Sequence, residues 1–269
     1  MRKRREKIRL GRPDIEKDDI RSVASILATG MLVQGPVVEA FESKIAGMLG
    51  APHGVAVSSG TAALHLALKA VGVEPGDEVV VPAFTFPATA NVVEWLGARP
   101  VFCDIAPGSF NAGPEQFANA LTRRTRAVMA VHAFGSLADV PAITTAVRRA
   151  TRRRSGAQVV PAVVEDAACA LGSSLHGTPA GMLGRVGCFS FHPRKIMTTG
   201  EGGLVVTAGK AIARRVRAMR SHGLLRTSGR WRLSEPGLNY RMADFQAAWG
   251  LRSWGSITTP RGPCSGPSG

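Results

Sequence analysis

Short runs of apolar and β-branched residues alternate along the chain with longer segments in which apolar residues recur at helical spacing. The apolar runs predict strands at Gly54–Val57, Glu78–Val81, Pro100–Cys103, Ala127–Val131, Val159–Val164, Gly187–Phe191 and Gly203–Thr207. The helical spacing predicts helices at Thr61–Val71, Ala88–Leu96 and Val140–Ala150. Strands and helices that alternate in this way are typical of βαβ units. The pattern therefore predicts the α/β class, with a mostly parallel central sheet flanked by helices.

The hydrophobic pattern also divides the chain into one large domain and a short tail. A chain of 269 residues with 45% hydrophobic side chains can bury a sizeable core, and we expect residues 1–250 to form it. Residues 251–269, LRSWGSITTPRGPCSGPSG, have no sustained period and are rich in Gly, Pro and Ser, which predicts an irregular tail. Two interpretations of the tail stay open: a flexible natural C-terminus, and a truncated or frame-shifted end.

Positive charge dominates the chain, because 34 Lys and Arg residues outnumber 19 Asp and Glu residues and give a formal net charge of +15. The charges cluster at residues 1–7, Arg148–Arg154 and Arg214–Arg220, and each cluster is typical of a solvated terminus or helix face. A single tyrosine supplies few aromatic surfaces for stacking bases, so we expect no nucleic-acid partner. An acidic small molecule fits the charge better.

Two further patterns bear on where the protein works. No apolar stretch is long enough to span a bilayer, which predicts no membrane association. The four cysteines have no C-x-x-C spacing, and the N-terminus passes from charged into polar sequence without a signal peptide. We therefore expect a cytoplasmic protein.

The segment SSGTAALHLALKA, residues 58–70, places hydroxyl groups and a glycine between a predicted strand and a predicted helix. Backbone N–H groups at the start of a helix, hydroxyl donors and a glycine that allows close approach together form an anion site, for which phosphate is the commonest ligand. A second interpretation is that Ser59 or Thr61 only caps the helix. The segment alone leaves both interpretations open.

The segment VVEDAACALG, residues 163–172, ends an apolar strand with Glu165 and Asp166. Open α/β sheets bind ligands at the carboxyl ends of their strands, and a carboxylate there can hold a cationic ring nitrogen. The alternative is that Asp166 caps a helix over residues 167–171.

The segment SFHPRKIMTTGEGG, residues 190–203, places Lys195 between a predicted strand and a Gly-rich turn. An amine attacks a carbonyl only when it is deprotonated, and nearby cations or desolvation lower its pKa. Without other sites, a solvated surface lysine would be the ordinary interpretation. A phosphate site, a strand-end aspartate and a lysine together are what pyridoxal phosphate requires: an anchor for its phosphate, a partner for its ring nitrogen and an amine for its aldehyde.

From GRPDI (residues 11–15) to NYRMADFQAA (residues 239–248), the chain resembles the DegT/DnrJ/EryC1/StrS sugar aminotransferases, a family of fold type I pyridoxal-phosphate enzymes. The matching stretches are QGPVVEAFE, SSGTAALHLAL, GDEVVVPAFTFPATANVV, PVFCDI, VHAFGSLADV, VVEDAACALGSSLHG, GCFSFHPRKIMTTGEGG and NYRMADFQAA. The resemblance implies transfer of an amino group from an amino acid to a nucleotide-linked keto sugar, and glutamate is the expected donor.

The resemblance also implies roles for individual residues. Lys195 would react with the cofactor's aldehyde and move a proton between substrate carbon and cofactor, and Asp166 would pair with the protonated ring nitrogen. The other cofactor contacts that it implies are Gly60, Thr61 and Ser190 at the phosphate and Phe86 and Cys169 at the ring. Asn239 matches an asparagine that reaches the phosphate in the neighbouring subunit, which implies a homodimer with shared active sites. The resemblance implies no metal.

The chain departs from the family pattern in two places. Cys169 stands where the family usually has His or Gln, so we expect the ring contact there to be lost or altered. The pattern ends after about Leu251, whereas family members continue into a small C-terminal domain that helps to close the substrate site. A truncated, non-catalytic remnant or a regulatory protein that retains the large domain is therefore the alternative function. A related sugar dehydratase is disfavoured, because those enzymes have histidine in place of Lys195.

Overall fold

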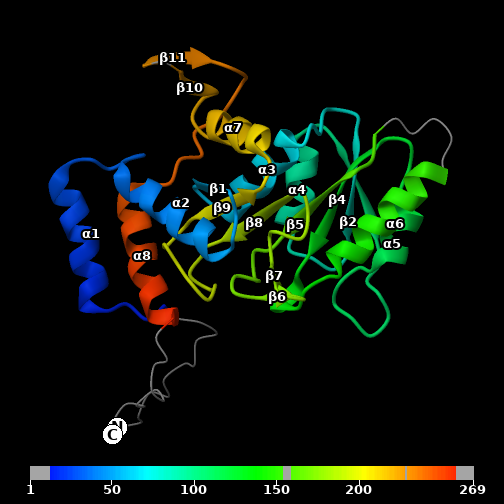
Figure 1. Ribbon diagram of the computed structural model, residues 1–269, viewed down its shortest axis with the longest axis horizontal. Helices are drawn as coiled ribbons and strands as arrows, with labels where there is room; N and C mark the ends of the chain where they lie inside the picture. Colours follow the sequence, from blue (N-terminus) through cyan, green and yellow to red (C-terminus); the bar gives the residue numbers. More distant parts are fainter. Residues whose placement is uncertain (1–12, 154–158, 228, 259–269) are drawn as a thin grey trace, which may run out of the picture.

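A central sheet of seven strands organises the computed structural model, which describes residues 13–153, 159–227 and 229–258 (Figure 1). In spatial order the strands are β1 (His53–Val57), β9 (Gly203–Thr207), β8 (Val186–Ser190), β5 (Ala162–Asp166), β4 (Thr125–Val131), β2 (Glu78–Pro82) and β3 (Arg99–Cys103). Neighbours from β8 through β3 pair in parallel, whereas β9 is antiparallel to β8 and β1. The predicted class, α/β with a mostly parallel sheet flanked by helices, is confirmed.

Each predicted apolar run overlaps a strand of this sheet, and the boundaries differ most at the run Val159–Val164. The run Val159–Val164 becomes a strand, β5, only after Pro161. Val159 and Val160 are exposed, at 53% and 45% of their full surface. Proline has no N–H group to donate to a neighbouring strand, so it is disfavoured inside a central strand. The valines before it therefore lie outside the sheet despite their hydrophobicity.

Helices cover both faces of the sheet, and the strands are buried against them except at the edge strand β3, of which only Cys103 is buried. One face packs against α3 (Gly60–Ala70), α4 (Ala88–Trp95) and α7 (Lys210–Met219). The other face packs against α2 (Pro36–Met48) and α8 (Asp244–Thr258) at one end, and α5 (Pro114–Ala120) and α6 (Val140–Arg153) at the other. In β2, Val79 and Val81 belong to the first face and Val80 to the second. A strand buried on both sides must be continuously apolar, which explains the runs in the sequence.

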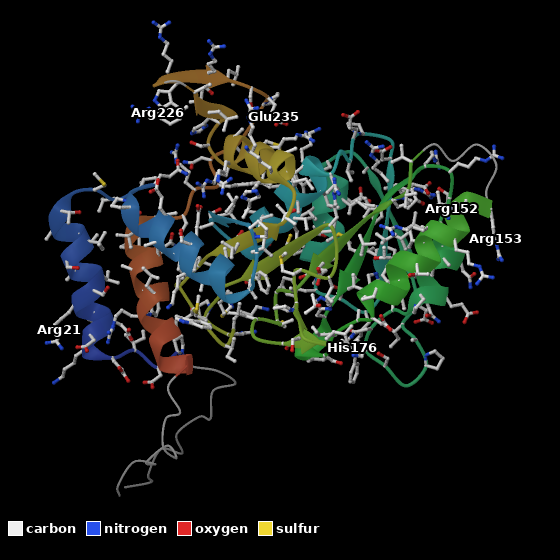
Figure 2. The ribbon with its side chains drawn as sticks, viewed as in Figure 1. Arg21, Arg152, Arg153, His176, Arg226 and Glu235 are labelled. Carbon is white, nitrogen blue, oxygen red and sulfur yellow. The ribbon has the colours of Figure 1, made fainter. Side chains whose placement is uncertain are left out.

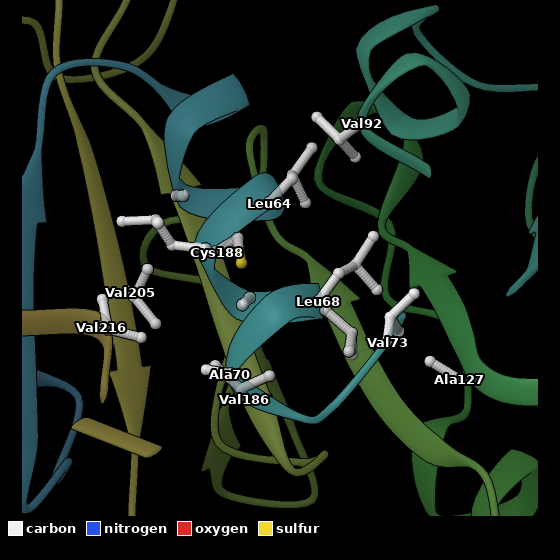
Figure 3. Close-up of a cluster of buried hydrophobic side chains, with 14 of the residues drawn as sticks. Leu64, Leu68, Ala70, Val73, Val92, Ala127, Val186, Cys188, Val205 and Val216 are labelled. Atoms are coloured by element: carbon white, nitrogen blue, oxygen red, sulfur yellow. The ribbon is translucent and has the colours of Figure 1, made fainter. Parts of the chain in front are cut away.

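Helix α3 forms the centre of the first face. Figure 3 shows Leu64 and Leu68 of α3 in the same buried cluster as Cys188 of β8 and Val205 of β9. Each fully buried leucine contributes roughly 1.5–3 kcal/mol relative to an exposed one. This packing fixes α3 over the strands whose ends carry the predicted site residues.

The C-terminal helix, α8, extends further than the sequence predicted. Residues 251–269 were expected to be irregular, but α8 continues through Leu251 to Thr258. Trp254 packs against the core cluster beside α2, and Arg252 donates to Asp18 of α1 (Lys17–Thr29) at 3.1 Å. Tertiary contacts of this kind outweigh the low helix propensity of the glycines and serines in the segment. Residues 259–269, the rest of the predicted tail, lie outside the described residues.

The basic clusters divide into exposed and buried groups. Figure 2 shows Arg152 and Arg153 at the exposed end of α6, as predicted for a solvated helix face. Arg220, which follows α7, is instead buried; it pairs with Glu42 of α2 and donates to the carbonyl of Ala56 in β1 at 2.7 Å. The prediction of a solvated face is therefore wrong for Arg220, whose pairing links three elements. The cluster at residues 1–7 lies outside the described residues.

Two small two-stranded sheets and a short 3-10 helix complete the described fold. The hairpin β10 (Leu224–Thr227) with β11 (Arg230–Leu233) projects beyond α7 (Figure 1). The hairpin β6 (Ser174–Leu175) with β7 (Thr178–Pro179) follows β5, and η1 (Ala133–Gly135) follows β4. None of the helices in the described part of the chain has the length and apolar composition needed to cross a membrane.

We expect Gly203→Ala to destabilise the fold and to displace the start of α3. A Cβ at residue 203 would overlap the backbone carbonyl of Ser59, which cannot rotate away. Gly47→Ala in α2 is the matched control, because its new methyl group has open space and alanine favours helices. Urea unfolding should show a loss of about 1–3 kcal/mol for Gly203→Ala and a gain of up to about 1 kcal/mol for Gly47→Ala. Equal stabilities of the two variants would contradict the close packing at Gly203.

Candidate active site

The sheet topology brings the predicted site residues to one edge. Strands β1 and β8 both pair antiparallel with β9, so they run in the same direction, and β5 is parallel to β8. The carboxyl ends of these three strands therefore share an edge. Ser58 follows β1 there, Asp166 ends β5, Ser190 ends β8, and Lys195 lies in the loop that leaves β8. This edge is where α/β sheets bind ligands.

The first turn of α3 presents donors suited to an anion. Ser59 is the N-cap, and its hydroxyl accepts from the N–H of Ala62 at 3.1 Å, so the capping interpretation is correct for Ser59. Within the described part of the chain, the N–H groups of Gly60 and Thr61 have no hydrogen-bond acceptor. Gly60 approaches Ser190 so closely that a Cβ at residue 60 would lie 2.8 Å from Ser190 Cβ. Unpaired N–H groups at a helix start, beside hydroxyl groups, are suited to bind a phosphate. Gly60, Thr61 and Ser190 are therefore called the phosphate cradle.

Asp166 is buried at the end of the middle strand, with 6% of its surface exposed. The Thr89 hydroxyl donates to Asp166 Oδ2 at 2.8 Å, and the Ala168 N–H donates to Oδ1 at 3.2 Å. Burial raises the pKa of Asp166, although these two hydrogen bonds and the charge of Lys195 act in the opposite direction. The residues that follow form turns, so Asp166 does not cap a helix there. A cation placed against this carboxylate would be strongly favoured.

Lys195 lies in a loop that is closed by the carbonyl of Phe191. This carbonyl accepts from the Thr199 N–H at 3.1 Å and from the Thr198 hydroxyl at 2.9 Å. Lys195 is half-buried rather than solvated, and its Nζ donates to Cys169 Sγ at 2.9 Å. Its charge is close enough to Asp166 to lower the pKa of that carboxyl. The structure thus brings an amine, a thiol and a carboxylate into one site.

Cys169 differs from the other cysteines of the described chain in its exposure. Cys103 and Cys188 are buried, and burial raises the pKa of Cys103 to about 11 and that of Cys188 well above its usual range. Cys169 is exposed beside the Lys195 amine. Its predicted contact with a cofactor ring stays a prediction, since what the structure shows is its contact with the amine.

Phe86 and Asn239 lie at the margins of the site. Phe86 is 76% exposed, just before α4. Asn239 is exposed and forms an isolated bridge with Ser221. The carbonyl of the next residue, Tyr240, accepts from the Ser58 N–H at 2.8 Å, which places Asn239 near the phosphate cradle of its own chain. Its predicted reach into a neighbouring subunit stays a prediction.

His132 and Glu165 form a buried hydrogen-bonded pair next to Asp166. His132 Nδ1 accepts from the Ala138 N–H at 3.1 Å, so Nε2 carries the ring proton and donates to Glu165 Oε2 at 2.9 Å. Glu165 also accepts from the N–H groups of Gly181 at 2.7 Å and Gly184 at 2.6 Å. The carboxylate is therefore satisfied by three donors and holds the turn after β7 against β5.

Sequence reasoning missed the residues that orient Asp166. Thr89 donates to its side chain, and the N–H of His132 donates to its backbone carbonyl at 3.1 Å. Both residues lie in stretches that carry the family resemblance, FTFPAT and VHAFG. No spacing rule links either stretch to Asp166, because the contacts arise from the order of strands in the sheet.

These groups match the requirements of pyridoxal phosphate. The unpaired N–H groups of Gly60 and Thr61 would hold a phosphate, and the buried carboxylate of Asp166 would hold a protonated ring nitrogen. The half-buried amine of Lys195 would meet an aldehyde. The residues present therefore fit the group.

Comparison with known proteins gives one consistent family. The pattern of the DegT/DnrJ/EryC1/StrS aminotransferase family matches residues 13–259. The spore coat polysaccharide biosynthesis protein SpsC of Bacillus subtilis is 39% identical over 248 residues, which cover 89% of this chain and 61% of SpsC. GDP-perosamine synthase of Caulobacter vibrioides is 40% identical over 217 residues, which cover 81% of this chain and 56% of the synthase.

A solved structure gives the same result for the fold. The PLP-form of Spr1654 from Streptococcus pneumoniae superposes with a TM-score of 0.85 at 29% identity, over 92% of this chain and 66% of that protein. The chain thus spans only about three fifths of the length of the curated relatives that it matches. The family pattern reaches residue 259, so its predicted end after Leu251 is wrong.

We expect Asp166→Asn to change how the stability of the cofactor-free chain depends on pH. The pKa of Asp166 is raised by burial, so this group favours folding most below the unfolded value of 3.8, and the advantage is lost as pH rises through the folded pKa. Urea unfolding of both proteins between about pH 4 and about pH 8 should show the wild-type chain losing stability relative to the variant as pH rises. A difference that does not change with pH would contradict the raised pKa.

Proposed function

The chain belongs to the DegT/DnrJ/EryC1/StrS aminotransferase family, and we propose that it is a pyridoxal-phosphate-dependent aminotransferase. It moves an amino group from an amino acid, with glutamate the first candidate, to a nucleotide-linked keto sugar. The observation that carries the proposal is the meeting of Lys195 and buried Asp166 beside unpaired N–H groups at one edge of the sheet.

Each group has a distinct task in this reaction. Bound pyridoxal phosphate supplies an electron sink for breaking bonds at the carbon next to the amine. Asp166 holds the ring nitrogen in its protonated form by charge, which keeps the sink effective. Gly60, Thr61 and Ser190 hold the phosphate. Lys195 is the attachment point, and its amine then carries the proton at the substrate carbon.

The burial of Asp166 explains why it can hold a ring cation firmly. An ion pair is stronger where water is excluded, and Asp166 is buried while Lys195 is half-buried. Gly60, Thr61 and Ser190 would hold the phosphate and Asp166 the ring nitrogen, so the cofactor would be fixed at two points and Lys195 would be free to act on its aldehyde. Such fixed geometry is what makes proton transfer at one carbon efficient.

The substrate class rests on charge and on the relatives. A formal net charge of +15 favours an acidic ligand such as a sugar nucleotide diphosphate. The Caulobacter relative is a GDP-perosamine synthase, a name that refers to a nucleotide-linked amino sugar. Lys195 disfavours the related sugar dehydratase reaction, because those dehydratases have histidine in place of this lysine.

Two further parts of the proposal concern the setting of the enzyme. We propose a homodimer in which Asn239, whose side chain is exposed, reaches the cofactor of the partner subunit. We also place the reaction in the cytoplasm, where the thiol beside Lys195 would stay reduced. The alternative function is a regulatory or other non-catalytic protein of this fold, in which the cofactor binds at Lys195 without amino transfer.

We expect borohydride reduction of the chain mixed with pyridoxal phosphate to label Lys195. The half-buried amine beside Asp166 is the one placed to meet the aldehyde. Peptide mapping by mass spectrometry should find the reduced cofactor on Lys195 in the wild-type chain and no specific label in Lys195→Ala. Lys210→Ala, in the exposed first turn of α7, is the control and should label like the wild type. A specific label on another lysine would sink the assignment.

The chain with bound pyridoxal phosphate, before any reduction, separates the two candidate functions. An aminotransferase should convert its bound cofactor to the amine form when glutamate is added, and the absorbance change reports this half-reaction. A labelled Lys195 without conversion by any amino acid would favour the non-catalytic alternative.

A further inference from the structure

A chain of hydroxyl groups leads from the loop before α4 to the buried carboxylate of Asp166. Thr85 Oγ1 lies 2.8 Å from Thr89 Oγ1, and Thr89 Oγ1 lies 2.8 Å from Asp166 Oδ2. Thr89 is fully buried, with 0% of its surface exposed, whereas Thr85 is half-buried. This chain of hydroxyl groups therefore connects the partly exposed rim of the site with the buried carboxylate.

The direction of the protons along this chain follows from the charge of Asp166. A threonine hydroxyl has one proton to donate, and an ionised carboxylate only accepts. When Asp166 is ionised, Thr89 must donate to it, and Thr85 must donate to Thr89. Hydrogen bonds to a charged acceptor are stronger than neutral ones, and each bond in such a chain polarises the next. Both hydroxyls are then oriented by the charge that they stabilise.

Thr89 uses its hydroxyl differently from another buried threonine of the fold. Thr151 in α6 donates to the carbonyl of Val147 one turn earlier in its own helix, at 2.8 Å. Thr89 donates instead across the sheet edge, to a residue far away in the sequence. A threonine inside a helix can donate its hydroxyl to the carbonyl four residues earlier in the same helix. The bond from Thr89 to Asp166 therefore serves the carboxylate rather than the helix.

Other groups that face Asp166 cannot replace this bond. The Ala168 N–H reaches only Oδ1, at 3.2 Å, and the N–H of His132 donates to the backbone carbonyl. Lys195 acts on the carboxyl through its charge, and the Cys188 thiol is buried on the neighbouring strand. Thr89 is the donor that orients Oδ2.

We propose that Thr89, assisted by Thr85, is a positioning residue that holds the Asp166 carboxylate ionised and oriented toward the ring nitrogen of the cofactor. The inference rests on the proposed function, because it concerns how Asp166 meets pyridoxal phosphate. Its consequence is specific: Thr89 strengthens cofactor binding only through the ring nitrogen, and not through the phosphate or the aldehyde.

The test compares pyridoxal phosphate with its 1-deaza analogue, in which a C–H group replaces the ring nitrogen. The affinity of each is measured by absorbance titration of the full chain, and the ratio of the two affinities reports the contribution of the ring nitrogen. The variants are Thr89→Val, which keeps the shape and removes the hydroxyl, Thr89→Ser, which restores it, and Thr85→Val. Thr151→Val is the matched control, a buried helix threonine whose hydroxyl serves its own helix.

We expect Thr89→Val to bind pyridoxal phosphate about tenfold to hundredfold more weakly, as for loss of a hydrogen bond to a charged group. Its affinity for the deaza analogue should change little, so the ratio collapses. Thr89→Ser should recover most of the ratio, Thr85→Val should lower it partly, and Thr151→Val should leave it unchanged. If Thr89→Val does not fold, the ratios of Thr89→Ser and Thr85→Val decide, and an unchanged ratio in Thr85→Val overturns the hydroxyl chain.

An equal loss of affinity for both compounds in Thr89→Val would overturn the inference and leave a structural role for this threonine. A wild-type chain that binds neither compound would remove the proposed function itself. The two failures are thus distinguished by the behaviour of the wild-type protein.

Discussion

The burial of one carboxylate, Asp166, is the constraint around which the site is arranged. A charged group in a low-dielectric interior is unfavourable unless it is compensated, and here burial raises the pKa of the group. The compensation comes from three different parts of the chain: the Thr89 hydroxyl, the Ala168 N–H and the charge of Lys195. The order of the strands brings Thr89 and Lys195 to Asp166, and the turn after β5 brings Ala168, so the fold and the chemistry of the site depend on the same requirement. A cationic ring nitrogen would complete the compensation.

The two consecutive acids at the end of β5, Glu165 and Asp166, have different roles: one stabilises the fold and the other faces the site. Successive side chains of a strand point to opposite faces, so Glu165 and Asp166 meet different neighbours. Glu165 faces His132 and the turn after β7, where three donors satisfy it. Asp166 faces Thr89 and Lys195 with fewer donors. The fully satisfied carboxylate stabilises the fold, and the less satisfied one remains available to a ligand.

The sequence predicted the seven strands of the sheet and three of the helices, and the places where it failed have physical causes. Alternation of apolar runs predicted the seven strands of the sheet, because buried strands must be apolar on both faces. Composition predicted an irregular segment where α8 continues to Thr258, because contacts with α1 and the core hold that helix. A cluster of charges predicted a solvated face for Arg220, which is buried against Glu42. The bonds from Thr89 to Asp166 and from Lys195 to Cys169 could not be predicted, since each joins segments that only the fold brings together.

The central claim is that the edge of the sheet between α3 and β8 holds pyridoxal phosphate by three separate contacts. A crystal structure of the chain grown with pyridoxal phosphate tests it most directly. We expect the aldehyde carbon to be bonded to Lys195 Nζ, the ring nitrogen to lie within hydrogen-bond distance of Asp166, and the phosphate to lie on the N–H groups of Gly60 and Thr61. A cofactor bound elsewhere, or one whose ring nitrogen points away from Asp166, would contradict it.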